Sequence, residues 1–198
     1  MLRAALSGGI ATGKSFCLAR FAALGAATID ADILARDAVA PGSVGLEQVV
    51  RRFGAGVLLD DGRLDRPALG RLVFADRAAR ADLEAIIHPL VYRRIDDWFA
   101  DLPSGTRVAL ADIPLLFETG HQHDFERVVV CACDAAEQLR RLVTRDRLTA
   151  AEARARLAAQ WPIAEKVRRA DYVIRTDGTF AETEAQVRQV YEVLAAEA

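Results

Sequence analysis

Residues 7–16 of this 198-residue chain are Ser7-Gly8-Gly9-Ile10-Ala11-Thr12-Gly13-Lys14-Ser15-Phe16. Two of the glycines, the lysine and the following serine have the spacing G-x-x-x-x-G-K-[ST], typical of a loop that binds nucleotide phosphates. Glycines let such a loop turn with its N–H groups pointing toward phosphate oxygens. The lysine adds a compact positive charge at the β- and γ-phosphates, and the serine hydroxyl can bind Mg²⁺. The stretch therefore predicts a nucleotide site, with Lys14 at the phosphates and Ser15 at the metal.

The residues on either side of the loop fit this interpretation. Residues 2–6 predict a short apolar strand, and residues 16–24 predict a helix whose N-terminus adds free N–H groups and a positive dipole end. Of the 26 basic residues, only Lys14 and Lys166 are lysine. A lysine in such an arginine-rich chain favours a point-charge role that a planar guanidinium does not reproduce. The alternative is an ordinary glycine-rich turn, which the match of both spacing and context disfavours.

Composition and charge exclude several classes of protein. Hydrophobic residues make up 52% of the chain, and the net charge of −2 gives no electrostatic case for nucleic-acid binding. The three cysteines form no C-x-x-C pair, which indicates apolar thiols in a reducing compartment. We expect no signal peptide, and no apolar run approaches the ~18 residues of a membrane span. We expect a cytoplasmic protein without a membrane or nucleic-acid partner, and its oligomeric state stays open.

The apolar pattern predicts an α/β fold. Five short stretches are expected to be strands, at residues 2–6, 26–29, 106–112, 127–132 and 172–175. Helical patterns lie between them, and such alternation predicts a parallel sheet covered on both faces. The expected core therefore consists of residues 1–31, 106–135 and 170–198.

Two helical insertions interrupt this core. About 75 residues separate the second and third strands, far more than an ordinary crossover needs. Residues 32–105 are therefore expected to form a helical domain for a second substrate, and residues 136–169 a helical lid.

Local signals predict most helix boundaries. Ser43 is expected to begin a helix through Phe53, and capping boxes at 149–152 and 179–182 are expected to begin two more. Residues 54–63 resemble a hairpin. Pro67 and Pro89 suit first helical turns, so separate helices are expected at 67–74, 77–87 and 89–102.

Two acidic residues follow the second strand, at the sheet edge that faces ligands in open α/β folds. A carboxylate there can accept a hydroxyl proton during phosphoryl transfer. It can equally cap the helix that begins near Ile33. Since Asp30 and Asp32 are two residues apart, each can take one of these roles, and we favour Asp32 for the chemistry.

Further charged residues are candidates for the same site. Arg140, Arg141, Arg145 and Arg147 crowd the lid candidate. Arg141 and Arg145 share a helix face, where they could neutralise a transferring phosphoryl group, although a solvated arginine face is the alternative. Asp112 ends the third strand, where a carboxylate that orients Mg²⁺ would lie. His121 and His123 have no third ligand nearby and are expected to be exposed.

Ordered blocks along nearly the whole chain resemble the dephospho-CoA kinases, which complete coenzyme A synthesis. They are residues 6–15, 29–32 with Ala35-Arg36, His88-Pro89, 114–118, Arg145-Asp146, and 159–160 leading to 170–174. The resemblance implies a phosphate-loop kinase fold and transfer of the ATP γ-phosphate to the ribose 3′-hydroxyl of dephospho-CoA. Another small-molecule or nucleotide kinase is the alternative. A nucleotide-dependent switch is disfavoured, because neither lysine lies in an Asn-Lys-x-Asp motif.

The resemblance also implies roles for individual residues. Asp32 matches the general base, and Lys14 and Ser15 match the phosphate and Mg²⁺ positions. Beside these matches, residues 8–16 and Arg141 are our candidates for binding ATP. Arg145 matches a lid arginine that closes over the phosphates. Arg36 and His88 would contact the acceptor.

Two residues of the loop depart from the usual family pattern. Ala11 replaces a glycine, so this position must either avoid a positive φ or tolerate strain. Phe16 replaces a threonine, which removes a hydroxyl near the α-phosphate. Both departures bear on ATP affinity more than on the reaction.

Overall fold

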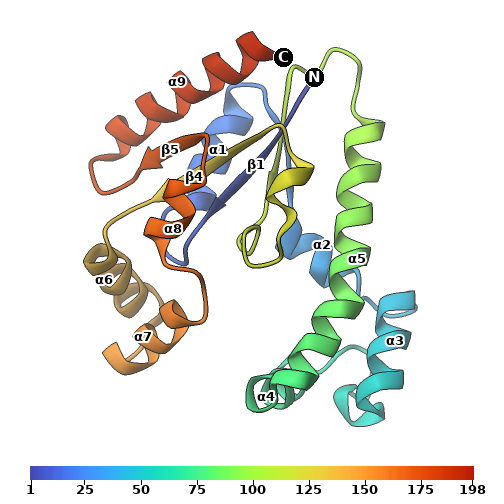
Figure 1. Cartoon of the computed structure of the whole chain (residues 1–198). Helices are drawn as coiled ribbons and strands as arrows, with labels where there is room; N and C mark the ends of the chain where they lie inside the picture. Colours follow the sequence, from blue (N-terminus) through green and yellow to red (C-terminus); the bar gives the residue numbers. More distant parts are fainter. The chain divides into compact units, whose positions relative to one another are not determined.

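The computed structural model describes residues 1–198 and contains a five-stranded sheet in the order β2-β3-β1-β4-β5 (Figure 1). The strands are β1 Leu2–Gly8, β2 Ala27–Asp30, β3 Val108–Asp112, β4 Arg127–Ala132 and β5 Tyr172–Arg175. Strand β1 pairs in parallel with both β3 and β4, and β4 pairs in parallel with β5. The predicted parallel α/β sheet is confirmed.

The register of the sheet brings three strand ends together. Leu6 of β1 is opposite Asp112 of β3, and Gly8 of β1 is opposite Cys131 of β4. The loop that follows β1 therefore begins between the carboxyl ends of β3 and β4, where ligands bind in such sheets.

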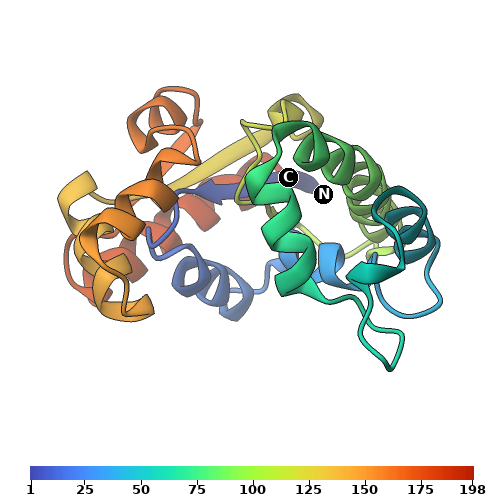
Figure 2. The same ribbon diagram turned by 90° about the horizontal axis from the view of Figure 1, so that it is seen from below.

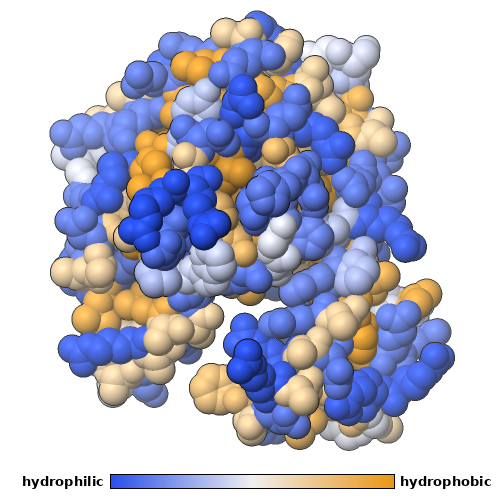
Figure 3. Space-filling model, in the orientation of Figure 1, coloured by the Kyte–Doolittle hydropathy of each residue, from blue (hydrophilic) through white to orange (hydrophobic).

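Strands β3 and β4 are buried along almost their whole length, which explains their uninterrupted apolar sequences. Helices α1 (Lys14–Ala23) and α9 (Phe180–Glu197) pack against each other, and helix α8 (Ile163–Arg168) contacts β4. Figure 2 shows α1 and α8 on opposite faces of the sheet. Phe21, Val187 and Leu194 are fully buried in the resulting core. In the view of Figure 3, hydrophilic side chains cover most of the surface.

The remaining helices of this part follow β4. They are α6 Ala135–Asp146 and α7 Ala150–Ala158. A short 3-10 helix, η2 (His121–Asp124), lies between β3 and β4. Both predicted capping boxes are present, at Thr149 with Glu152 and at Thr179 with Glu182.

The chain divides into two compact units, residues 1–29 with 102–198 and residues 30–101. The segment 136–169 belongs to the first unit, and its role as a lid remains a prediction. The second unit consists of α2 Ala31–Asp37, α3 Val44–Phe53, η1 Ala55–Val57, α4 Arg66–Ala75 and α5 Arg77–Asp101. It has its own apolar cluster, which includes Leu46, Val49, Val57 and Leu69.

Two predictions for the second unit need correction. The expected helices 77–87 and 89–102 are one helix, α5, with Pro89 in its interior. Proline lacks the N–H for one helical hydrogen bond, but Val91, Ile95 and Phe99 are buried and hold the helix beyond it. The expected hairpin at 54–63 is instead η1 followed by a single antiparallel bridge between Leu58 and Leu64.

Candidate nucleotide-binding site

The loop between β1 and α1 has the geometry of an anion site. Gly13 precedes α1 with a φ of 79°, and no side chain caps the helix, so no side chain competes with a ligand for the N–H groups of its first turn. A Cβ at Gly8 would lie 2.7 Å from both the Cys131 carbonyl oxygen and Thr12 Oγ1. Thr12 closes the loop by donating a hydrogen bond of 2.8 Å to the Gly9 carbonyl. The strand–loop–helix context expected from the sequence is confirmed.

Ala11 adopts a φ of 61°, which is left-handed backbone. A residue with a Cβ is disfavoured there by roughly 1–2 kcal/mol, which glycine would avoid. Of the two outcomes open to this position, the chain shows the tolerated strain.

Lys14 and Asp112 form an ion pair at the base of the loop. The Asp112 side chain is 2% exposed and Lys14 is 14% exposed, so the carboxylate is reached from the loop. The β1–β3 register explains this proximity, because Leu6 is opposite Asp112. The structure therefore brings Asp112 to the phosphate loop, and its role at Mg²⁺ remains a prediction.

The donor set fits Mg²⁺ bound together with a nucleotide. Ser15 is exposed at the first turn of α1 and supplies a hydroxyl, and Asp112 supplies a carboxylate. The structure contains no group of three His, Cys, Asp or Glu side chains that could hold a metal. Mg²⁺ commonly uses few protein ligands and takes the rest from phosphates and water.

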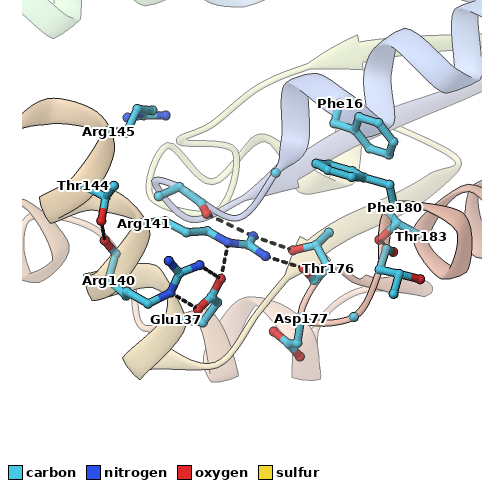
Figure 4. Close-up of a pocket in the computed structure, with 14 residues that line it drawn as sticks. Phe16, Glu137, Arg140, Arg141, Thr144, Arg145, Thr176, Asp177, Phe180 and Thr183 are labelled. Atoms are coloured by element: carbon cyan, nitrogen blue, oxygen red, sulfur yellow. Dashed lines mark hydrogen bonds and ion pairs between the residues drawn. The ribbon is translucent and has the colours of Figure 1, made fainter.

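A cavity of about 780 Å³ lies beside the loop in the first unit (Figure 4). It is lined by residues of the loop, α1, α6 and the β5–α9 connection: Ala11, Gly13, Phe16, Glu137, Arg140, Arg141, Thr144, Arg145, Thr176, Asp177, Gly178, Thr179, Phe180 and Thr183. Arg141 and Arg145 both line it, which confirms that they share a face.

Arg141 joins the parts of this cavity. Its guanidinium donates to Glu137 over 2.7 Å, to Thr176 Oγ1 over 3.1 Å and to the Thr176 carbonyl. It also donates to the Ala11 carbonyl over 3.5 Å. The Arg141 guanidinium therefore hydrogen-bonds both Ala11, the strained residue of the loop, and Thr176, which directly follows β5.

Arg145 is less constrained. Its side chain is 60% exposed and pairs with the adjacent Asp146 over 2.7 Å. In Figure 4 it lies apart from the Arg141 network. A ligand in the cavity would therefore compete with Asp146 for the exposed Arg145 guanidinium.

The pKa of Glu137 is lowered to about 2, because Arg140 and Arg141 both hydrogen-bond its carboxylate. Glu137 therefore carries its negative charge under all ordinary conditions and fixes Arg141 in place.

An aromatic pair forms another wall of the cavity. The ring centroids of Phe16 and Phe180 are 4.9 Å apart, and Phe180 is 75% exposed. The Arg20 guanidinium lies 4.8 Å from the Phe16 ring centre. Sequence reasoning missed Phe180, although a large apolar residue directly after the Thr179 cap was a usable signal.

The remaining candidates belong to the second unit. Asp30 is the N-cap of α2 and accepts hydrogen bonds from the N–H groups of Asp32 (2.7 Å) and Ile33 (3.3 Å). The capping role thus falls to Asp30, and the Asp32 carboxylate is exposed. Arg36 is also exposed, one turn along α2. His88 is half-buried in the middle of α5 rather than at a helix start.

The histidines and cysteines noted in the sequence do not line the cavity. His121 lies 2.6 Å from Asp124, and His123 is exposed. Cys17, Cys131 and Cys133 are buried free thiols. None of the helices is both long and apolar enough to cross a membrane.

Comparison with known proteins shows which family the chain belongs to. A family model described as dephospho-CoA kinase matches residues 2–182. A dephospho-CoA kinase of Geobacillus kaustophilus is 46% identical, over 92% of this chain and 91% of the relative. The crystal structure of TT1252 from Thermus thermophilus has a TM-score of 0.86 at 32% identity, covering 100% of this chain and 98% of that one. A dephospho-CoA kinase from Campylobacter jejuni has a TM-score of 0.75 at 28% identity, covering 98% of both chains. On these matches in sequence and fold, the chain belongs to the dephospho-CoA kinase family.

Proposed function

We propose that this family member transfers the γ-phosphoryl group of ATP to the ribose 3′-hydroxyl of dephospho-CoA, giving CoA and ADP. The observation that carries the proposal is the phosphate loop with the Lys14–Asp112 pair at its base, in a chain matched to this family over residues 2–182. Three buried free thiols favour work in the reducing cytoplasm.

The nucleotide is assigned to the first unit. Residues 8–16 would surround the phosphates, with N–H groups such as those of Lys14 and Ser15 as donors, and Lys14 would compensate the phosphate charge along the reaction path. Bound Mg²⁺, held by Ser15 and Asp112, would supply charge neutralisation to the same phosphates. Arg141 shapes the cavity for the rest of the nucleotide, and Arg145 would exchange its Asp146 partner for the transferring group.

The acceptor is assigned to the second unit. Asp32 would accept the proton of the 3′-hydroxyl while that oxygen bonds to the γ-phosphorus. The bond between the γ-phosphorus and the β,γ-bridging oxygen breaks, and ADP leaves with the electron pair. Arg36 and His88 are proposed acceptor contacts, which the resemblance supports.

The direct test incubates the protein with Mg·ATP and dephospho-CoA and measures ADP and CoA. The expected result is ADP release that depends on dephospho-CoA and is lost in Lys14→Ala. Absence of that dependence in the wild type would overturn the proposal. Faster turnover of a nucleoside monophosphate than of dephospho-CoA would favour the alternative, a nucleotide kinase.

A further inference from the structure

Lys166, the second lysine of the chain, is completely buried in α8. Its ammonium lies 2.8 Å from Glu118 Oε1 and donates to the carbonyls of Pro114 (2.9 Å) and Gly8 (3.2 Å). An ammonium has three N–H donors, so these three oxygens match its full capacity. A planar guanidinium directs its donors differently and would not fit the same three oxygens.

These contacts join separate parts of the first unit. Gly8 is the first glycine of the phosphate loop, whereas Pro114 and Glu118 follow β3. Glu118 Oε1 also accepts from the N–H of Trp161 over 2.8 Å. Lys166 therefore links the start of the phosphate loop to the segment after β3 and to the end of the 136–169 excursion.

Two glutamine side chains hydrogen-bond the same loop at Ile10, two residues after Gly8. Gln160 Oε1 accepts from the Ile10 N–H over 2.9 Å, and Gln138 Nε2 donates to the Ile10 carbonyl over 2.8 Å. Both ends of the lid candidate thus bond to the loop. The loop geometry depends on side chains more than 120 residues away as well as on its own glycines.

Burying this charge is unfavourable for stability alone. Desolvation lowers the pKa of Lys166, and the contact with Glu118 opposes that effect. Glu118 Oε2 is buried without a hydrogen-bond partner, and Lys166 compensates the charge of this carboxylate through Oε1. Apolar residues of similar volume often replace buried ion pairs with no loss of stability. Stability alone therefore does not explain why Lys166 and Glu118 are buried together. Their contact with the phosphate loop suggests that the pair serves the geometry of the loop.

We propose that Lys166 is a positioning residue for phosphoryl transfer, which holds the Gly8 carbonyl and so sets the start of the phosphate loop. Since it acts through the loop, it affects nucleotide binding and rate while touching neither substrate. The kinetic test of this inference rests on the proposed function. Nucleotide affinity is a second measurement that does not depend on it.

The test compares Lys166→Met with the double variant Lys166→Met/Glu118→Gln. Methionine removes the charge at similar length, and glutamine keeps an acceptor for the Trp161 N–H. Arg168→Met is the matched control, because Arg168 is on the same helix with a side chain that is 65% exposed. Melting temperature, ATP-analogue affinity, kcat and both KM values are measured well below the melting point of each variant.

We expect Lys166→Met to lower the melting temperature, and to reduce kcat and ATP-analogue affinity at least tenfold, with KM for dephospho-CoA within twofold of wild type. The double variant should regain melting temperature but not kcat or affinity. Kinetic constants and affinity within twofold of wild type in the folded variants, or their recovery together with the melting temperature, would overturn the proposal. If Lys166→Met does not fold, the double variant decides. If the wild type does not use dephospho-CoA, the proposed function fails, and analogue affinity still tests Lys166.

Discussion

Two neighbouring acids, Asp30 and Asp32, differ in their hydrogen bonds and therefore in the role that each can take. Asp30 accepts the N–H groups of Asp32 and Ile33, as an N-cap does. The Asp32 carboxylate has no part in the cap and stays exposed. The two residues should therefore respond differently to the same isosteric substitution.

Asp32→Asn should lower kcat by roughly 10²–10⁴, because it removes a proton acceptor of similar shape. ATP affinity should be unchanged, since the phosphates are assigned to the loop. Asp30→Asn is the control: asparagine also caps helices, and its kcat should stay near wild type. Steady-state kinetics of both variants checks this, and equal losses would contradict the assignment of the base to Asp32.

Alanine substitutions of Arg141 and Arg145, which share one face of α6, should also affect different steps. Arg145→Ala should lower kcat more than it raises KM for dephospho-CoA, because an exposed guanidinium acts on the transferring group. Arg141→Ala should chiefly weaken ATP binding and lower the melting temperature, because Arg141 holds the Ala11 and Thr176 carbonyls. Kinetics with calorimetry of both variants distinguishes them, and a matching profile would refute the separation.

Helix α6 carries Glu137, a charged residue of the cavity wall that bonds two arginines of the same helix. Glu137 has a folded-state pKa of about 2, below its ordinary 4.5, because Arg140 and Arg141 bond its carboxylate. A lowered carboxyl pKa gives stability that is fully present above the unfolded value and is lost as pH falls toward the folded one. The relevant window is thus between about pH 4.5 and pH 2.

In that window the free energy of unfolding of the wild type should fall more steeply with decreasing pH than that of Glu137→Gln. Denaturant unfolding at several pH values measures both slopes. Because Glu137 is at the surface, the difference should shrink at high salt. Parallel pH profiles would show that Glu137 is ionised alike in the folded and unfolded chains.

The elements also show what sequence reasoning reaches. Strands such as β4 and the two capping boxes were predictable, because burial and caps leave local signals. Pro89 misled, because the packing of Val91, Ile95 and Phe99 outweighs one missing hydrogen bond. At the site, the loop and Asp112 were predictable from spacing and strand ends. The network of Lys166, Gln160 and Gln138 was not, because its partners are distant in sequence and only the fold joins them.

Two separate apolar clusters distinguish the units of the whole molecule. The first unit contains the sheet core, the phosphate loop and the cavity, and the second contains the cluster around Leu46 and Val49. Damage to one cluster should therefore be felt mainly within its own unit.

Leu46→Ala should loosen the second unit, since such truncations typically cost about 2–5 kcal/mol. Hydrogen exchange should quicken within residues 30–101, and KM for dephospho-CoA should rise while ATP affinity stays within twofold of wild type. Phe21→Ala, in the core of the first unit, is the counterpart and should reverse this pattern. Exchange that quickens equally along the whole chain would show that the units unfold as one.

Strand β1 has a further consequence, because neighbours pair with it on both sides. Edge strands can fray while the interior persists, so amide protons of β1 should be among the slowest to exchange. A nucleotide bound at the end of β1 stabilises the folded chain, so it should slow the global opening through which β1 amides exchange. Ligand occupancy and resistance to proteolysis should consequently rise together, which would make the loaded enzyme the long-lived form in the cell.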